Sequence, residues 1–486
     1  MADVGLVDVT LRDGNQSLWG AAGLRSAHVL GVAPLLERVG FRALDYSSST
    51  AMGMLVRTFR EDPWALFRRT RALMPRTKLQ FIGTGFRFIS WQNSHPDTMQ
   101  LVYDRLAANG IDRVVVLDPM HDMDAARATA RRLKKAGIDE VVGALTYTIS
   151  GVHDDAFYAD IAGQMRACPD VDRVYVKDPA GILTAERART LLPAVRAALA
   201  GTPLELHSHA TIGLSPQTYA MAPDLGVEVV QTGCGAGGNG SSLPEVRRTV
   251  ANLREMGHTV DVDDRALDLA CTYVDRLAAA EELPAGRPQD FDAAFLHHQI
   301  AGGVMSTTRR QLREIGMADR FDELIAEVGR VRAELGHPIM VTPFPQMVVS
   351  QALFNLVGER WATVPDQVIR YAQGSFGRPS APIEPEVLDR VLGRARAREL
   401  AAEPPPPSPA ELRRTFGTAM SDEELLLRAH MPAEQVDAMV AAGPAAGHHN
   451  PELTGVLSLV RELGSRPAVH DLAITKPGMR LSVRRG

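Results

Sequence analysis

The fold is decided by a stretch that reads as strand, helix and strand in turn: RVYVKDPAGILTAERARTLLPAVRAALAGTPLELH, residues 173–207. Its two ends, Arg173–Val176 and Leu204–His207, are short runs with strand character. The segment between them, Ala185–Leu199, is a longer amphipathic run rich in Ala, Leu and Arg. Strands that are joined by a crossover helix lie parallel in one sheet. The stretch therefore predicts one strand–helix–strand unit.

The same alternation runs from residue 5 to about residue 255, with another helix expected at Ala125–Ala136. Six more strand candidates bring the total to eight: Gly5–Val9, Ala43–Tyr46, Leu79–Phe81, Arg113–Leu117, Glu140–Thr146 and Val227–Gln231. Eight regularly spaced alternations imply parallel strands, and the simplest closed form of such a sheet is a (β/α)8 TIM barrel. We therefore predict an α/β fold with a TIM barrel over residues 1–264.

The pattern changes after the barrel. Residues 265–402 read as a mainly helical domain, with helices expected at Phe321–Gly336 and Ile383–Arg396. A proline-rich linker, EPPPPSP at residues 403–409, is stiff and separates this domain from the rest. In residues 410–486 we expect a small helical segment at Ser421–Ala429 and a docking tail that begins at Glu452.

The composition excludes several classes of protein. The net charge of −5 leaves no basic excess that would attract nucleic acid. The three cysteines are far apart and form no CxxC pair, so neither a zinc knuckle nor a disulfide framework is indicated. The N-terminus has no apolar signal segment, and no apolar run approaches the roughly 18 residues of a membrane span. We expect a soluble, cytoplasmic protein.

Polar side chains close three of the expected strands. In a TIM barrel the catalytic groups lie at the C-terminal ends of the strands, so these residues can be read together. They are Arg12, Asp13 and Gln16 after the first strand, Lys177 at the end of the sixth, and His207 and His209 at the end of the seventh. Because all of them fall at one face of one barrel, they indicate a single active site.

Three of these side chains form a reasonable set of ligands for a divalent metal. Residues two apart in a strand point the same way, so His207 and His209 can reach one ion. A carboxylate from Asp13 completes a set of one oxygen and two nitrogens. The ammonium group of Lys177 is not a ligand as it stands, because it has no lone pair. Taken singly, an HxH pair is more often incidental and a lysine at a strand end more often pairs at the surface; the coincidence favours the site.

Three motifs carry a resemblance to a known family: TLRDGNQSL (10–18), YVKDPAG (175–181) and HSHATIG (207–213). They resemble the metal-site motifs of the carboxyltransferase domains of biotin-dependent enzymes. These are the pyruvate carboxylase, oxaloacetate decarboxylase alpha-subunit and transcarboxylase families, within the HMG-CoA lyase-like group of TIM barrels. Further matches in the second domain are HHQIAGGVMSTT (297–308) and VTPFPQMVVSQALFNLVGER (341–360). The resemblance covers residues 5 to about 400.

The resemblance implies a ligand set for a divalent ion such as Zn, Mn, Co or Mg. Asp13, His207 and His209 would bind the ion directly. Lys177 would bind it as a carbamate, a modification that replaces the nitrogen with an oxygen ligand. The ion would act as a Lewis acid on a carbonyl group and stabilise an enolate.

The resemblance also implies roles for residues around the metal. Arg12 would support the enolate oxygen, and Gln16 would help to bind the substrate. Ser306 falls where the family usually has a threonine that shuttles a proton between biotin and the enolate. A hydroxyl group is retained at that position, although a helix cap or a loop residue is an equally good interpretation of Ser306.

The expected substrate pocket departs from the family. Thr84 stands where the family has an arginine that grips pyruvate, and Arg87 lies three residues further on. We expect Tyr46, Ser48, Thr84 and Arg87 to face the ion from strands 2 and 3. The segment TGCGAGGNGSSLPEV (232–246) resembles the glycine-rich loop of aldolase and acyltransferase relatives, which makes Asn239 a substrate-binding candidate and Cys234 a weaker acid–base candidate. These departures predict poor use of pyruvate.

The chain has no Met-Lys-Met biotinylation motif, so we expect biotin to be supplied in trans on a carrier protein. The expected function is that of a carboxyltransferase or decarboxylase component that transfers a carboxyl group between carboxybiotin and an enolisable small acid such as pyruvate, oxaloacetate or a related acceptor. We expect it to work as a homodimer with a biotin carboxyl carrier protein and a biotin carboxylase component. A biotin-independent lyase or aldolase that uses the same enolate chemistry is a second interpretation. A non-catalytic component of a carboxylase complex is a third, and it would be expected to have a broken metal site.

Overall fold

The computed structural model describes residues 1–90, 92–300, 308–309, 312–314, 316–445 and 447, together with 459–460, 462–463, 466, 471–476 and 479–484 near the C-terminus. Within these residues no helix is long and apolar enough to cross a membrane.

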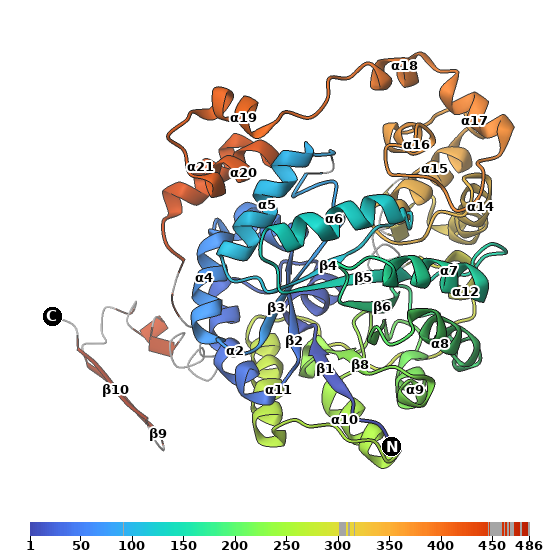
Figure 1. Ribbon diagram of the computed structural model, residues 1–486. Helices are drawn as coiled ribbons and strands as arrows, with labels where there is room; N and C mark the ends of the chain where they lie inside the picture. Colours follow the sequence, from blue (N-terminus) through green and yellow to red (C-terminus); the bar gives the residue numbers. More distant parts are fainter. Residues whose placement is uncertain are drawn as a thin grey trace.

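The N-terminal half forms a closed barrel whose strands follow one another in chain order (Figure 1). The strands are β1 (Gly5–Asp8), β2 (Ala43–Ser48), β3 (Lys78–Gly83), β4 (Arg113–Val116), β5 (Glu140–Thr146), β6 (Arg173–Asp178), β7 (Leu204–Ser208) and β8 (Val229–Thr232). Every neighbouring pair is parallel, and β1 pairs with β8 to close the sheet. The predicted TIM barrel is confirmed, since all eight strand candidates are strands of this barrel.

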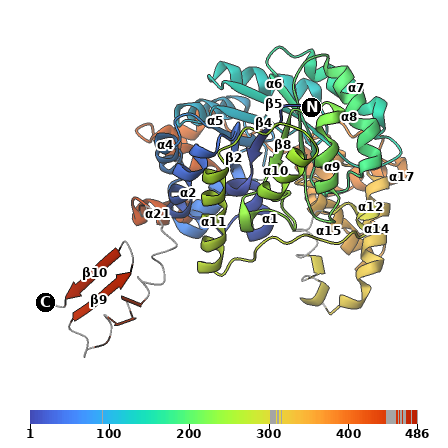
Figure 2. The ribbon, with the colours of Figure 1, turned by 90° about the horizontal axis from the view of Figure 1, so that it is seen from below.

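Helices surround the barrel, as the view along a second direction shows (Figure 2). They are α2 (Ser26–Val39), α4 (Pro63–Leu73), α5 (Pro96–Ala108), α6 (Met123–Lys135), α7 (Asp155–Arg166), α8 (Ala185–Leu199), α9 (Ser215–Met221), η3 (Pro223–Leu225), α10 (Val246–Glu255) and α11 (Asp264–Ala280). Helix α11 packs against α2, and its residues Leu267 and Val274 join the core of the barrel. The packing of the barrel therefore extends beyond residue 264, where we expected the first domain to end.

Short helices follow three of the strands at the mouth of the barrel, and those after β1 and β2 carry site residues. They are η1 (Thr10–Gly14) and α1 (Asn15–Trp19) after β1, α3 (Ser49–Met54) and η2 (Leu55–Phe59) after β2, and η4 (Gly235–Gly237) after β8. Helix α3 begins where the Ser48 hydroxyl accepts a hydrogen bond from the Ala51 amide, a normal N-cap.

A second unit of helices lies beside the barrel, at the upper right of Figure 1. Its helices are α12 (Phe295–His298), η5 (Ala318–Arg320), α14 (Phe321–Glu334), α15 (Phe344–Val357), α16 (Asp366–Ala372), α17 (Pro385–Leu392) and α18 (Ala395–Ala401). It has a hydrophobic core of its own that includes Phe344 and Tyr371. The single helix expected at Ile383–Arg396 is wrong, because the chain leaves the helix at Gly393 and is extended at Arg394 before α18 begins.

The C-terminal helical unit comprises α19 (Pro409–Phe416), α20 (Asp422–His430) and α21 (Ala433–Ala442). It lies beside α4 and α5 rather than beside the second unit of helices (Figure 1). Buried apolar side chains on α20 and α21, including Leu426 and Val436, belong to the same hydrophobic core as the barrel. Two antiparallel strands, β9 (Asp471–Lys476) and β10 (Met479–Arg484), follow near the C-terminus.

One short segment between α14 and α15 reaches into the mouth of the barrel. Ile339 and Val341 are buried in a cluster with Leu117 and Tyr175, which come from the barrel strands and the residues that follow them. The second unit therefore covers part of the opening in which the catalytic groups of a TIM barrel lie.

Candidate active site

Four side chains at the ends of β1, β6 and β7 converge in the mouth of the barrel. The Nε2 atom of His207 lies 3.2 Å from the Asp13 Oδ2 atom and 3.2 Å from the His209 Nε2 atom. The Lys177 Nζ atom lies 2.7 Å from the His207 Nε2 atom and 3.4 Å from the Asp13 Oδ2 atom. One ligand atom each from Asp13, His207 and His209 lies within 4.8 Å of the others, as a shared ion would require. The structure thus brings together the four residues named from the sequence as metal ligands.

In both histidines the Nδ1 atom, which points away from the converging side chains, has a hydrogen-bond partner that determines which ring nitrogen carries the proton. His207 Nδ1 lies 2.8 Å from the side-chain oxygen of Gln231, and His209 Nδ1 lies 2.6 Å from the main-chain oxygen of Ser241. Both partners are oxygens that accept hydrogen bonds, so the neutral rings carry their protons on Nδ1. Each Nε2 atom is then left with a lone pair directed at the converging group, which is how histidines bind a metal.

The charges at this point favour ligands in their binding forms. Burial would raise the pKa of Asp13, but the neighbouring charges of Arg12 and Lys177 hold it well below its ordinary value. Burial, reinforced by the charge of Lys177, lowers the pKa of His207 to about 3. Burial also lowers the pKa of the Lys177 ammonium group. An ionised carboxylate and a neutral imidazole are the forms that bind a divalent cation.

A closed ring of buried polar side chains, here called the polar ring, supports these residues from inside the barrel. Its members are all at most 5% exposed: Arg12, Asp13, Asp45, Gln80, Arg113, Glu205, Gln231 and His207. From His207 the ring passes through Gln231 to Glu205, whose carboxylate lies 2.6 Å from the Arg113 guanidinium. It returns through Gln80 and Asp45 to Arg12 and Asp13. Because each member is held on both sides, the ring fixes the orientation of its side chains.

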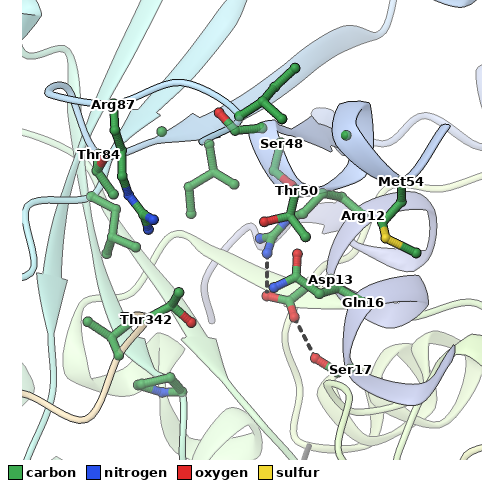
Figure 3. Close-up of a pocket in the computed structure, with 18 of the residues that line it drawn as sticks. Arg12, Asp13, Gln16, Ser17, Ser48, Thr50, Met54, Thr84, Arg87 and Thr342 are labelled. Atoms are coloured by element: carbon green, nitrogen blue, oxygen red, sulfur yellow. Dashed lines mark hydrogen bonds and ion pairs between the residues drawn. The ribbon is translucent and has the colours of Figure 1, made fainter. Parts of the chain in front are cut away.

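The converging residues form one wall of a cavity of about 270 Å³. Arg12, Asp13 and Gln16 lie on one side of it, while Thr84 and Arg87 lie on the other side and the Arg87 guanidinium points into the space between them (Figure 3). We call the side with Asp13 the metal wall. We call the opposite side, formed by Arg57, Thr84 and Arg87, the far wall.

The far wall is built from the segments that follow β2 and β3. Arg57 comes from η2, and Arg87 comes from the β3–α5 loop, of which the structure describes residues 84–90 and 92–95. Burial lowers the pKa of the Arg87 guanidinium to about 10. The two segments touch at Gly53, where a Cβ atom would lie 2.9 Å from the Ile89 side chain. A side chain at residue 53 could therefore be accommodated only if Ile89 moved.

Sequence reasoning missed a contribution from the second unit of helices. Met340, Val341, Thr342 and Pro345 line the same cavity, and Thr342 lies at its edge in Figure 3. The signal was present, because these residues lie in or beside the VTPFPQ motif that carried the family resemblance. Nothing in the motif itself indicates that it meets the barrel.

The structure places two of the expected substrate-binding residues, Tyr46 and Asn239, away from the residues that line the cavity. The Tyr46 hydroxyl donates a hydrogen bond to Thr70 on α4, and the Tyr46 ring packs against Phe67 outside the barrel. The register shift in β2 between Asp45 and Ser47 breaks strict alternation, so Tyr46 faces out of the barrel while Ser48, two residues further on, lines the cavity.

Asn239 is not among the residues that line the cavity. It adopts a left-handed backbone conformation with φ of 63°, and its side-chain oxygen accepts a hydrogen bond from the Glu245 amide. Asparagine is common in such turns because its side chain bonds to nearby backbone. Cys234 is also absent from the lining; it is fully buried, and contact with Cys271 together with burial raises its pKa. Ser306 lies outside the described residues.

Comparison with known proteins decides the family. A model of the conserved carboxylase domain matches residues 295–445. Over 391 residues the chain is 32% identical to one of the subunits of pyruvate carboxylase from Methanocaldococcus jannaschii, and the alignment covers 80% of this chain and 68% of that protein. The chain belongs to this carboxylase family.

Other members of the carboxylase family align over most of their length. The methylmalonyl-CoA carboxyltransferase 5S subunit of Propionibacterium freudenreichii subsp. shermanii is 28% identical over 469 residues, which cover 93% of this chain and 90% of that protein. The 2-oxoglutarate carboxylase large subunit of Hydrogenobacter thermophilus is 28% identical over 459 residues, which cover 92% of this chain and 70% of that protein.

The carboxyl transferase domain of Rhizobium etli pyruvate carboxylase has the same fold, with a TM-score of 0.81 at 20% identity over 99% of this chain and 84% of that chain. The relatives described above are carboxylases and carboxyltransferases, so the present chain is an enzyme, a biotin-dependent carboxyltransferase. The interpretation as a non-catalytic component of a complex is set aside on this ground.

Proposed function

We propose that this chain transfers a carboxyl group between carboxybiotin, carried on a separate protein, and a small anionic acceptor that it enolises. The observation that carries the proposal is the convergence of the Asp13 carboxylate with two imidazole Nε2 atoms whose protons are held on the opposite nitrogen. One carboxylate and two neutral imidazoles are a fitting donor set for a divalent ion. Such an ion, when bound, would act as a Lewis acid on the carbonyl oxygen of the acceptor.

Lys177 is proposed as the fourth ligand, in the form of a carbamate. Its amine lies 2.7 Å from the His207 Nε2 atom and is at most 5% exposed, in a position where an added carboxylate group would meet the same ion. Zn, Mn, Co and Mg all accept oxygen and nitrogen ligands, and metal analysis distinguishes them.

The chain's own groups would orient the acceptor between the two walls. Arg12 and Gln16 lie on the metal wall, where Arg12 would stabilise negative charge that develops on the acceptor oxygen. Arg87 would bind a carboxylate of the acceptor from the far wall, beside the hydroxyl of Thr84. Ser306 is proposed to carry the proton between biotin and the acceptor, on the family resemblance alone.

The acceptor is proposed to be an anion other than pyruvate. Arg57 and Arg87 both line the far wall, whereas Asp13 is the single carboxylate in the lining that the structure describes. Arg87 occupies a different position from the arginine that the family uses for pyruvate. A relative that is named for the carboxylation of 2-oxoglutarate supports longer 2-oxo acids as the first acceptors to test.

Partners follow from the relatives' names. Two of the relatives are named as one subunit of a pyruvate carboxylase, which implies at least one further subunit in those enzymes. We therefore propose that the chain works with a biotin carboxyl carrier protein and a separate biotin carboxylase. We propose a homodimer as the oligomeric state. We propose that the chain divides into the barrel together with α11, the second unit of helices up to residue 402, and residues 410–486, with the proline-rich linker at 403–409 before the last part. We propose the cytoplasm as its location.

The test is solvent deuterium exchange into pyruvate, 2-oxoglutarate, oxaloacetate and acyl thioesters. Each is incubated with the full chain, with and without a biotinylated carrier protein, before and after treatment with a chelator. We expect exchange into a 2-oxo acid that depends on the metal, and carboxyl transfer that depends on the carrier. Cleavage of a carbon–carbon bond with no effect of the carrier would instead identify a biotin-independent lyase. No exchange into any acceptor by the metal-loaded chain would overturn the proposal.

A further inference from the structure

The β3–α5 loop, which carries Arg87, is anchored by parts of the chain that follow it by several hundred residues. From the second unit of helices, the main-chain oxygen of Ser375 accepts a hydrogen bond from Asn93. The Phe376 ring from the same unit lies 6.2 Å from the ring of Phe86. From the C-terminal helical unit, His430 contacts the loop at two residues. The loop is therefore held between two later segments of the chain.

His430 is the last residue of α20, and its ring makes three contacts in defined directions. Its Nδ1 atom lies 2.8 Å from the main-chain oxygen of Leu426, one turn earlier in the same helix. Its Nε2 atom lies 2.9 Å from the Ser94 hydroxyl in the loop. The ring stands edge-on to Phe88, with a centroid separation of 5.4 Å and an interplanar angle of 88°.

These contacts fix the protonation of the ring. A main-chain oxygen only accepts hydrogen bonds, so Nδ1 carries the proton and donates it to Leu426. Burial lowers the pKa of His430, which favours the neutral ring. The Nε2 lone pair then accepts a hydrogen bond from the Ser94 hydroxyl. His430 thus binds the helix with one edge and the loop with the other.

Phe88 connects this contact to the cavity. It is 1% exposed, stacks on Trp64 of α4, and immediately follows Arg87 in the chain. Both Arg87 and Phe88 line the cavity. Because adjacent residues share a peptide unit, a contact that fixes Phe88 also restricts the backbone from which the Arg87 side chain projects.

The same unit packs against the other segment of the far wall. Helix α21 contacts η2, which carries Arg57. Polar contacts also hold the C-terminal helical unit against the barrel. The carboxylate of Glu423 on α20 accepts hydrogen bonds from Arg68 on α4 and from Asn109, the residue that follows α5. Buried Leu426 and Met439 complete an apolar contact with the barrel core.

We propose that the C-terminal helical unit is a part of the acceptor-binding apparatus and that His430 is a positioning residue for Arg87. The role given to Arg87 rests on the proposed function. The contacts that anchor the loop do not depend on that function. Recognition of a carboxylate by a guanidinium group requires placement within roughly 0.5 Å, and surface loops reach that precision only when a second layer of contacts holds them. His430 and Ser94 supply that layer from a segment distant in sequence.

The test uses the full chain with three variants. His430→Phe keeps an aromatic ring against Phe88 and removes the hydrogen bond to the loop, whereas Ser94→Ala removes the same bond from the other side. Arg428→Gln is the matched control, because Arg428 lies on the same helix but pairs with Glu424 and Asp437 inside the unit. Amide hydrogen exchange of the loop peptides and the KM and kcat for the best 2-oxo acid acceptor are measured for each variant.

We expect His430→Phe and Ser94→Ala each to speed amide exchange in the β3–α5 loop and to raise KM about tenfold, which corresponds to about 1.4 kcal/mol. The metal content and kcat should change less than about twofold, and the double variant should be no worse than either single variant because both remove one bond. The control should retain the wild-type KM and loop exchange.

Unchanged loop exchange in both folded variants would overturn the anchoring role. Faster loop exchange with an unchanged KM would overturn the positioning role. If the wild-type chain turns over no acceptor, the proposed function fails, and amide exchange alone then decides whether His430 anchors the loop. A purely structural role for the unit would lower the melting temperature of all three variants, the control included, and would leave KM unchanged.

Discussion

The two walls of the cavity are built in different ways. The metal wall comes from the ends of strands β1, β6 and β7, and the polar ring holds it from inside the barrel. The far wall comes from η2 and the β3–α5 loop, and it is held by segments around residues 375 and 430. The metal wall therefore depends on buried contacts between barrel strands, whereas the far wall depends on contacts made by segments distant in the sequence.

This difference separates chemistry from recognition. A barrel can retain the groups that stabilise an enolate while its loops change the acceptor, because the two sets of residues lie on different supports. We expect changes to the metal wall to abolish turnover of every acceptor. Changes to the far wall should instead alter KM and the order of preference among acceptors.

The largest effect is expected for Lys177→Arg. Arginine keeps a positive charge but cannot form a carbamate at that position, so the fourth ligand is lost. We expect loss of the bound metal and a fall in kcat of roughly a thousandfold or more, since Lewis-acid stabilisation is worth several kcal/mol. Metal analysis and circular dichroism check that the ion is lost while the fold is retained. Full metal content and activity in this variant would show that the carbamate assignment is wrong.

Arg87→Ala should affect recognition alone. A hydrogen bond to a charged group contributes about 1.5–3 kcal/mol, so KM for a carboxylate acceptor should rise roughly ten- to hundredfold. The metal content should stay at its wild-type value, and uncharged acceptors should lose much less. Steady-state kinetics with acids and with the corresponding amides measure the difference. Tight binding of pyruvate that survives Arg87→Ala would contradict the assignment of the far wall.

Gln231→Leu tests the support behind the metal wall. The variant removes the oxygen that holds the proton on His207 Nδ1, so the ring can place a proton on Nε2 and lose its lone pair there. We expect metal affinity to fall roughly 10- to 100-fold, as is common for such outer partners, with restoration of activity by excess metal. Titration of the metal-free chain measures it. An unchanged affinity would mean that His207 keeps its tautomer without the polar ring.

The smallest effect is expected for Tyr46→Phe. The hydroxyl bonds to Thr70 outside the barrel, so its loss should cost about 0.5–1.5 kcal/mol of the free energy of unfolding. KM and kcat should be unchanged, because the side chain does not reach the cavity. Denaturant unfolding and steady-state kinetics give the two numbers. A large rise in KM would place Tyr46 in the recognition of the acceptor after all.

The residues of the metal wall are easier to predict from the sequence than those of the far wall, and the reason is physical. His207 and His209 could be placed because strict alternation along a strand needs no knowledge of other segments. Tyr46 was misplaced by a single bulge in β2, which alternation does not reveal. Thr342 lies in a family motif and His430 lies in none, but the nearness of both residues to the cavity arises only from how separate units pack. Asn239 has a side chain that could bind a ligand, but in the structure it occupies a turn position with a left-handed backbone conformation, which asparagine tolerates.

The segment at Ile339 and Val341, which packs into the mouth of the barrel, has a consequence for the order of synthesis. Chains fold largely from the N-terminus as they leave the ribosome, at roughly 5–20 residues per second. The eight strands of the barrel emerge before Ile339, Val341 and His430. On the order of ten seconds therefore pass between synthesis of the last strand and synthesis of the segments that cover the mouth of the barrel. We expect the metal wall to form during that interval, before the far wall has the contacts that hold it. The proposed ion would then bind to the nascent chain before the acceptor can be selected.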